Sequence, residues 1–149
     1  MYMTSKEIII YTAGLFDGEG TVSLSKSREN KYGFRYPSVS LSSTTPELIQ
    51  FMKENFGGCI CIQKKTKPNH SQSYNWRIGR NASLNFLITI SPYIKEPSKI
   101  YRTNLIISEY KKLTPRNGRY SQEMILKKKD FESRFFNINP PSRGIHLIP

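Results

Sequence analysis

The sequence contains few groups that could form a disulfide bond or hold a zinc ion. Its 149 residues include two cysteines and two histidines. Cys59 and Cys61 are one residue apart, so both thiols point to the same face of a strand, and a bridge between them would strain the backbone. His70 and His146 lie far apart in the chain and complete no set of zinc ligands. We therefore expect reduced, half-buried cysteines and no zinc.

Long hydrophobic runs are also missing. The apolar stretches at 8–10 and 86–90 are much shorter than the ~20 residues that a membrane-spanning helix needs. The first ten residues carry a lysine and a glutamate, and they lack the apolar core and the cleavage site of a secretory signal. We expect no membrane partner and an intracellular location, in the cytoplasm of a prokaryote or in an organelle.

Acidic residues are scarce compared with basic ones. The chain has 23 Lys and Arg against 11 Asp and Glu, a net charge of +12, and residues 76–149 alone hold 14 basic and 5 acidic residues. A hydrophobic fraction of 37% with 12% aromatics can build a packed core, which excludes a disordered basic tail. The excess of basic over acidic residues indicates a polyanionic partner, because neutralising phosphates releases counterions. A merely solubilising cationic surface is the alternative.

The spacing of the apolar residues predicts alternating helices and hairpins. Thr4 and Glu7 form a capping box before the apolar run that opens the first helix. The apolar period then changes to two, as it does in half-buried strands, and returns to the helical period after each hairpin. The predicted elements are helix 5–17, strands 21–27 and 36–42, helix 44–56, strands 59–63 and 73–79, and helices 81–91 and 98–112.

This order predicts one α+β domain over residues 1–149, with a core at about 5–112 and a basic extension at about 113–149 that holds an extra helix or tail. The four strands can form one sheet that packs one face on the helices. The other face is rich in Ser, Thr, Asn, Gln and Arg and nearly free of acids, which favours a polar partner over simple solvation. The run 127–129 is either a clamp on a nucleic-acid backbone or a solvated basic helix.

The segment T-A-G-L-F-D-G-E-G combines small residues with a carboxylate. Ala13 and Gly14 have almost no side chain, so two copies of this helix could approach closely. Gly18 and Gly20 let the chain leave the helix sharply, which puts Glu19 at the head of the first strand, beside the polar face. A carboxylate repels phosphates, but a divalent cation between them removes the repulsion. Mg²⁺ characteristically binds through one or two carboxylates together with phosphate oxygens.

This segment resembles the motif of the LAGLIDADG homing endonucleases, and the predicted order of elements is similar to that family's αββαββα domain over about residues 5–112. Because the chain has one copy of the motif, the resemblance implies a homodimer with the motif helices packed at a two-fold axis. It also implies a four-stranded antiparallel sheet that forms a DNA-binding saddle. The activity implied is Mg²⁺-dependent, site-specific hydrolysis of both strands of a long pseudo-palindromic DNA target by an intron-encoded enzyme. Mn²⁺ or Ca²⁺ would substitute for Mg²⁺ in binding.

The resemblance assigns roles to single residues as well. Glu19 would be the catalytic metal ligand, with the carbonyl of Gly18 as a second contact, and Asp17 would be structural. Phosphodiester hydrolysis needs charge stabilisation on both the attacking and the leaving oxygen, which two Glu19 residues brought together by dimerisation could supply. The family's active-site lysine would be Lys99, with Lys95 as the competing candidate.

DNA would be read by the polar faces of the strands, because a two-stranded ribbon fits a major groove. The candidate reading residues are Ser23, Ser25, Ser27, Tyr36, Ser38, Ser40, Gln63, Lys65, Asn75 and Arg77. The candidate phosphate contacts, which position the protein without reading sequence, are Arg102, Lys111, Lys112, Arg116 and Arg119. Two other functions stay open: an RNA maturase that binds its own intron RNA to assist splicing, and a DNA-binding regulator that does not cleave.

Overall fold

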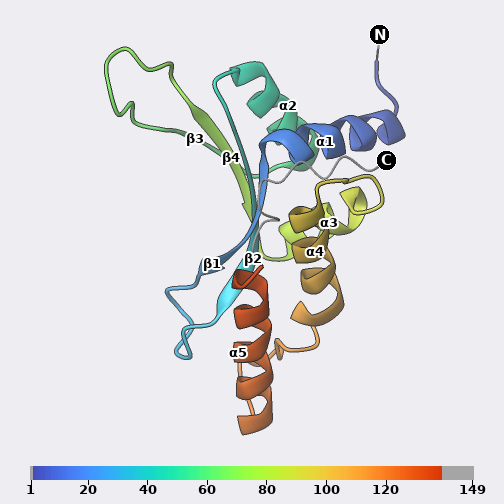
Figure 1. Ribbon diagram of the computed structural model, residues 1–149, viewed down its shortest axis with the longest axis vertical. Helices are drawn as coiled ribbons and strands as arrows, with labels where there is room; N and C mark the ends of the chain where they lie inside the picture. Colours follow the sequence, from blue (N-terminus) through green and yellow to red (C-terminus); the bar gives the residue numbers. More distant parts are fainter. Residues whose placement is uncertain (1, 139–149) are drawn as a thin grey trace, which may run out of the picture.

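The computed structural model of the protein describes residues 2–138. A four-stranded antiparallel sheet in the order β1-β2-β4-β3 has α1, α3 and α4 gathered on one side (Figure 1). The predicted α+β architecture is confirmed. In chain order the elements are α1 (Ser5–Glu19), β1 (Gly20–Lys26), β2 (Arg35–Ser43), α2 (Pro46–Phe56), β3 (Cys59–Ile62), β4 (Tyr74–Gly79), α3 (Asn81–Ile90), α4 (Pro97–Leu105), the π-helical turn η1 (Ile106–Tyr110) and α5 (Gln122–Phe136).

The first helix passes directly into the first strand without a loop. The predicted capping box begins α1, since Thr4 accepts a bond from the Glu7 backbone and donates its own N–H to the Glu7 carboxylate. The helix ends at Glu19, two residues later than expected, and the N–H of Gly20 closes it on the carbonyl of Phe16. A Cβ at Gly20 would overlap the Phe16 ring, so glycine is required at this junction.

Gly20→Ala is expected to destabilise the protein by about 1–3 kcal/mol, because the added methyl group must displace the fully buried ring of Phe16. Gly14→Ala is the matched control, since a Cβ there meets nothing and alanine favours a helix by about 1 kcal/mol. Urea unfolding of dilute protein measures both variants. Equal midpoints for the two variants would contradict the close approach of Phe16 to Gly20.

The strand register separates an apolar from a polar face. Val22 pairs with Val39 on the apolar side, while the next pair along the two strands, Thr21 with Ser40, lies on the opposite side. Ser40 in turn pairs with Arg77 of β4. The two predicted hairpins and their alternation are confirmed, and β2 and β4 join the hairpins into one sheet.

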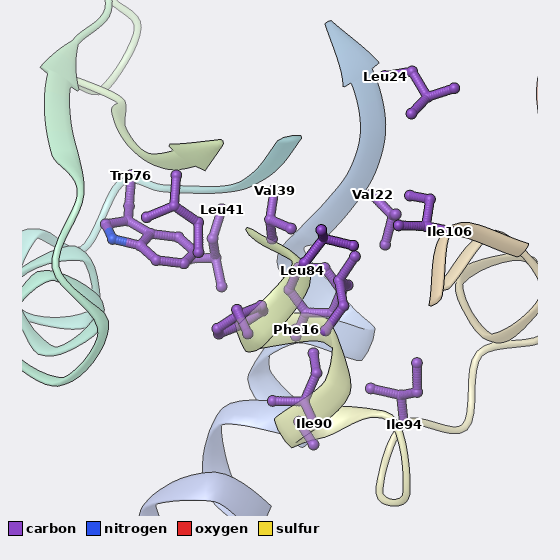
Figure 2. Close-up of a cluster of buried hydrophobic side chains, with 14 of the residues drawn as sticks. Phe16, Val22, Leu24, Val39, Leu41, Trp76, Leu84, Ile90, Ile94 and Ile106 are labelled. Carbon is purple, nitrogen blue, oxygen red and sulfur yellow. The ribbon is translucent and has the colours of Figure 1, made fainter. Parts of the chain in front are cut away.

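The core lies between the apolar face of the sheet and the helices. Figure 2 shows Phe16 of α1, Trp76 of β4 and Leu84 of α3 gathered there. Phe16 and Trp76 are fully buried, and Phe86 lies edge-on to Phe16 at 5.5 Å between ring centroids. The indole N–H of Trp76 donates to the carbonyl of Gly57, at 2.7 Å, so its one polar atom is satisfied.

Three expectations about the periphery need correction. The helix expected at 98–112 is divided, because α4 ends at Leu105 and the chain continues as the wider turn η1. Cys59 and Cys61 are exposed rather than half-buried, because they lie on the polar face, which no described element covers. The extra helix expected in the extension is present as α5, but Lys128 within it is buried, so the basic run is not uniformly solvated.

Residues 139–149 of the extension lie outside the described residues. No helix within residues 2–138 is long and apolar enough to cross a membrane.

Burial lowers the pKa of Lys128 from 10.5 to about 8, although the Glu132 charge opposes the shift. From pH 8 upward the native state releases a proton that the unfolded chain keeps, so stability should rise with pH by about 2 kcal/mol up to pH ~10. Burial also raises the pKa values of Tyr110 and Tyr120, so above pH 10 the unfolded chain loses protons that the native state retains, and stability falls. Urea unfolding between pH 7 and 11 should show this maximum. Lys128→Met should remove the rise in stability between pH 8 and 10. An unchanged rise in that variant would contradict its assignment to Lys128.

Candidate active site and nucleic-acid interface

Asp17 ties the end of α1 to the segment between α3 and α4. Its carboxylate accepts hydrogen bonds from the backbone N–H of Lys95, at 2.9 and 3.1 Å to the two oxygens, and from that of Glu96, at 3.1 Å. Because these partners are almost 80 residues away in the chain, Asp17 fixes the last turn of α1 in the tertiary structure. Asp17 therefore has a structural role, which is the kind of role that the resemblance implies for it.

Lys99 reaches the same helix end from the first turn of α4. Its ammonium donates to the carbonyl of Phe16 at 2.9 Å and to that of Asp17 at 2.6 Å. The side chain of Lys95, in contrast, is exposed, and only its backbone N–H contacts the motif. The structure therefore distinguishes the two candidate lysines, since Lys99 alone directs its side-chain charge at the carbonyl end of α1, where a cation is favourable.

Glu96 holds this lysine in place by capping α4. Its carboxylate accepts from the backbone N–H of Ser98 and Lys99, at 3.2 and 2.8 Å, and from the Ser98 hydroxyl at 2.7 Å. Burial raises the pKa of Glu96, but these hydrogen bonds and the nearby Lys99 charge outweigh burial and leave it below the ordinary value. Glu96 therefore stays charged near neutral pH and keeps the start of α4 against α1.

Glu19 is the last residue of α1, exposed, and adjacent to the polar face of β1. No ion pair within residues 2–138 involves it. The described part of one chain also contains no cluster of three or more His, Cys, Asp or Glu side chains that could hold a metal ion. At the end of α1 one chain thus offers a single available carboxylate, because Asp17 is engaged, with the carbonyl of the exposed Gly18 next to it.

The small residues of the motif do not share one role. Ala13 is 1% exposed and packs within its own core, contrary to the expectation that it would line a contact between two helices. Gly14 is exposed, and nothing lies within 4 Å of the position that its Cβ would take. Gly18 is similarly open one turn later, and Ile10, one turn earlier, is 45% exposed. We call the exposed side of α1 formed by Ile10, Gly14 and Gly18 the open face of α1.

The predicted DNA-reading residues divide into three sets. Ser23, Ser25, Ser38, Ser40, Tyr36, Asn75 and Arg77 belong to strands. Ser27 lies just beyond β1, and Gln63 and Lys65 are exposed in the β3–β4 connection. Ser38 is only 6% exposed and shares a hydrogen bond of 2.6 Å with Ser25, so it supports the face from within rather than presenting a free hydroxyl.

The polar face also contains residues that the sequence interpretation passed over. Cys59 pairs with Arg77, and Cys61 pairs with Asn75. The alternation of side chains along a strand already assigns both thiols to one side of β3. The predicted DNA-reading residues lie on that same side of the sheet. Thr21 completes the row at the end of β1 nearest Glu19. Arg80, directly after β4, was not singled out either, although it directs a cation over the ring of Tyr36.

The predicted phosphate contacts lie on different sides of the molecule. Arg102 stacks its guanidinium on the ring of Phe135, at 5.0 Å, between α4 and α5. Lys112 borders a hollow between the same two helices. Lys111 and Arg116 instead line a groove together with Arg80. Arg119 is exposed in the turn before α5.

Comparison with known proteins identifies relatives of this fold. The family described as LAGLIDADG endonuclease matches residues 12–99. A solved structure of the homing endonuclease I-CvuI in complex with the I-CreI target is 15% identical, covers 91% of this chain and 84% of its own, and has a TM-score of 0.65. The group I intron-encoded homing endonuclease I-CeuI, complexed with DNA, is 14% identical, with 96% and 72% covered and a TM-score of 0.63. The homing endonuclease I-TnaI is 19% identical, with 93% and 92% covered and a TM-score of 0.57.

No curated protein matches the sequence significantly. At such low identities the solved structures establish the fold alone, whereas the family match spans more than half of the chain and includes the motif that ends in Glu19. The chain belongs to the LAGLIDADG endonuclease family.

Proposed function

We propose that the protein is a homodimeric, Mg²⁺-dependent homing endonuclease that cuts both strands of a long pseudo-palindromic DNA site. The observation that carries this proposal is the position of Glu19. Its carboxylate is exposed and free of ion pairs in the described chain, it borders a polar sheet face, and it directly follows the open face of α1. A nuclease of this family needs its acid in such a position, next to both the DNA and the second subunit.

The geometry of α1 supports the proposed dimer. Residues 10, 14 and 18 are spaced by four, so they lie on one side of the helix, and the two glycines allow a second helix backbone to approach closely. Because Glu19 comes directly after Gly18, a two-fold contact along this side brings two Glu19 carboxylates near the axis. The dimer would then offer two Glu19 carboxylates near the axis as metal ligands, whereas one chain offers only one.

The donor set fits a hard divalent cation. Glu19 would hold it through carboxylate oxygens and Gly18 through its carbonyl, which are the ligand types that Mg²⁺ accepts, while the remaining positions are left for DNA phosphates and water. When bound, the ion would supply a nucleophilic water and neutralise charge on the scissile phosphate. Mn²⁺ or Ca²⁺ would occupy the same donors for binding.

Lys99 is a positioning residue in this proposal. Its ammonium is engaged by the carbonyls of Phe16 and Asp17, so it holds the turn that carries Gly18 and Glu19. Together with the bonds made by Asp17, this contact keeps the carboxylate at one place on the rim of the polar face. Proton transfer by Lys99 is not needed for that role.

Intron encoding and the intracellular location also belong to this proposal. The compared structures that carry nucleic acid are complexes with DNA, so intron RNA gains no support as a partner. The free carboxylate of Glu19 argues against the regulator that does not cleave, because an acid facing DNA without a metal would only repel it.

The test is cleavage of the duplex that joins the sequences flanking the intron of the host gene. With Mg²⁺ we expect two strand breaks at one position, and with EDTA we expect none. DNA binding that is equal with and without metal and never leads to cleavage would favour the regulator. Binding of the intron RNA in preference to this duplex would favour the maturase.

A further inference from the structure

Arg80 has a backbone conformation that arginine rarely adopts. Its φ is +58° and its ψ is −132°, and within residues 2–138 no other residue except glycine has a positive φ. Such a conformation strains the backbone of a residue that has a side chain. The surroundings impose it, because the N–H of Arg80 donates to Pro37 at 2.8 Å and its carbonyl accepts from the Ser83 hydroxyl at 2.7 Å. Glycine would fit this backbone better, so the arginine side chain needs another reason to be here.

That side chain extends to the outer end of the polar face. The guanidinium lies over the ring of Tyr36, with its central carbon 4.5 Å from the ring centroid. Tyr36 pairs with Ser25 in the sheet, five residues along β2 from Leu41, which pairs with Gly20 beside Glu19. At the rise of a strand this separation is about 15–20 Å. Arg80 thus stands at the end of the polar face that is remote from the proposed cleavage centre.

Two further cations meet Arg80 from the connection between α4 and α5. Lys111 and Arg116 are exposed and line the same groove of about 860 Å³, whose lining includes no carboxylate. We call these three residues the outer basic cluster. An adjoining hollow adds Lys31 and one acid, Glu29, together with Arg35, whose guanidinium already faces Glu132 at 4.0 Å. Three cations drawn together from distant parts of the chain repel one another unless an anion lies between them.

We propose that the outer basic cluster binds backbone phosphates of duplex DNA at the outer end of each half-site. The proposal rests on the proposed function, since it continues the same DNA path beyond the residues that would read bases. The planar guanidinium of Arg80, oriented by Tyr36, can bind two phosphate oxygens, and Lys111 and Arg116 add charge in the same groove. DNA is favoured over other polyanions because the cluster is continuous with the polar sheet face.

The experiment measures binding of a fluorescent 40-base-pair DNA duplex of arbitrary sequence, in Ca²⁺, over a series of salt concentrations. Phosphate contacts do not depend on sequence, so the natural target is not needed. Arg80→Gln, Lys111→Gln and Arg116→Gln should each weaken binding severalfold and lower the slope of log affinity against log salt by about 1. Lys53→Gln removes the same charge from an exposed position on α2 and should change neither quantity.

Arg80→Gly provides a second test, in which weaker DNA binding cannot be attributed to a destabilised fold. Glycine accepts the positive φ, so this variant should unfold at the same or a higher urea concentration than the wild type while binding DNA as weakly as Arg80→Gln. Wild-type affinity and slope in all the cluster variants would overturn the proposal while leaving the endonuclease assignment intact. Losses confined to an RNA duplex of the same length would overturn DNA as the partner. Failure of the wild type to bind this duplex even at low salt would also overturn the proposal, whereas the proposed function is tested separately by cleavage of the duplex that joins the intron-flanking sequences.

Discussion

Glu19→Gln is expected to abolish DNA cleavage and leave DNA binding and folding nearly unchanged. The amide has the shape of the carboxylate but carries no charge, so the site loses its ligand for a divalent cation. Metal assistance contributes several kcal/mol to phosphodiester hydrolysis, which corresponds to a loss of about 1000-fold or more in the cleavage rate. Because Glu19 is exposed and forms no ion pair in the described chain, its replacement should not change the urea midpoint.

The control is Glu54→Gln, which removes one exposed carboxylate from α2, remote in the chain from the motif. It should cut at the wild-type rate. Rates are compared in single-turnover assays with Mg²⁺, and binding is compared with Ca²⁺ in its place. Cleavage by Glu19→Gln at a rate near that of the wild type would remove the residue from the active site, whatever the role of the rest of the motif.

Gly14→Leu is expected to convert a dimer into monomers and to abolish double-strand cleavage. The leucine side chain would fill the open face of α1, where nothing in the chain itself lies within 4 Å. A second helix could then no longer approach closely, and the two Glu19 residues would stay apart. The monomer should remain folded, and the helix should gain about 1 kcal/mol, because leucine is a better helix former than glycine.

Sedimentation equilibrium with and without DNA measures this change, and nicking of one strand is measured in parallel with cleavage of both. Thr89→Leu adds a similar side chain to an exposed position of α3 and should remain dimeric and active. A dimeric and active Gly14→Leu would rule out the open face as the subunit contact. A monomeric wild type that nevertheless cuts both strands would rule out the dimer altogether.

Local patterns were sufficient to predict the framework of the molecule. The capping box at Thr4 begins the first helix, and the period of two assigns Val22 and Val39 to the core with their neighbours outside. These signals depend on residues close together in the chain. Ala13 shows their limit, because a small residue on a helix can serve its own core or a second helix, and only the packed structure distinguishes the two.

Long-range contacts were not accessible in the same way. The ammonium of Lys99 binds the carbonyls of residues more than 80 positions earlier, and no periodicity carries that information. Arg80 was missed because an arginine after a strand suggests ordinary surface, and its left-handed backbone arises from bonds to Pro37 and Ser83. For Cys59 and Cys61 the alternation predicts the correct face, but the predicted half-burial is wrong and both residues are exposed. The exposure of that face depends on which elements cover it.

The alternation of the strands has a consequence for how the protein can evolve. Thr21, Ser40 and Arg77 form a row in which no side chain contributes to the apolar core, while their neighbours Val22 and Val39 belong wholly to it. Substitutions in the row therefore change what the surface recognises at little cost to folding. Glu19 is attached to the rigid end of α1 and stays in place during such changes. Under the proposed function, a lineage can therefore drift toward new target sites through these exposed positions while the proposed cleavage site is inherited intact.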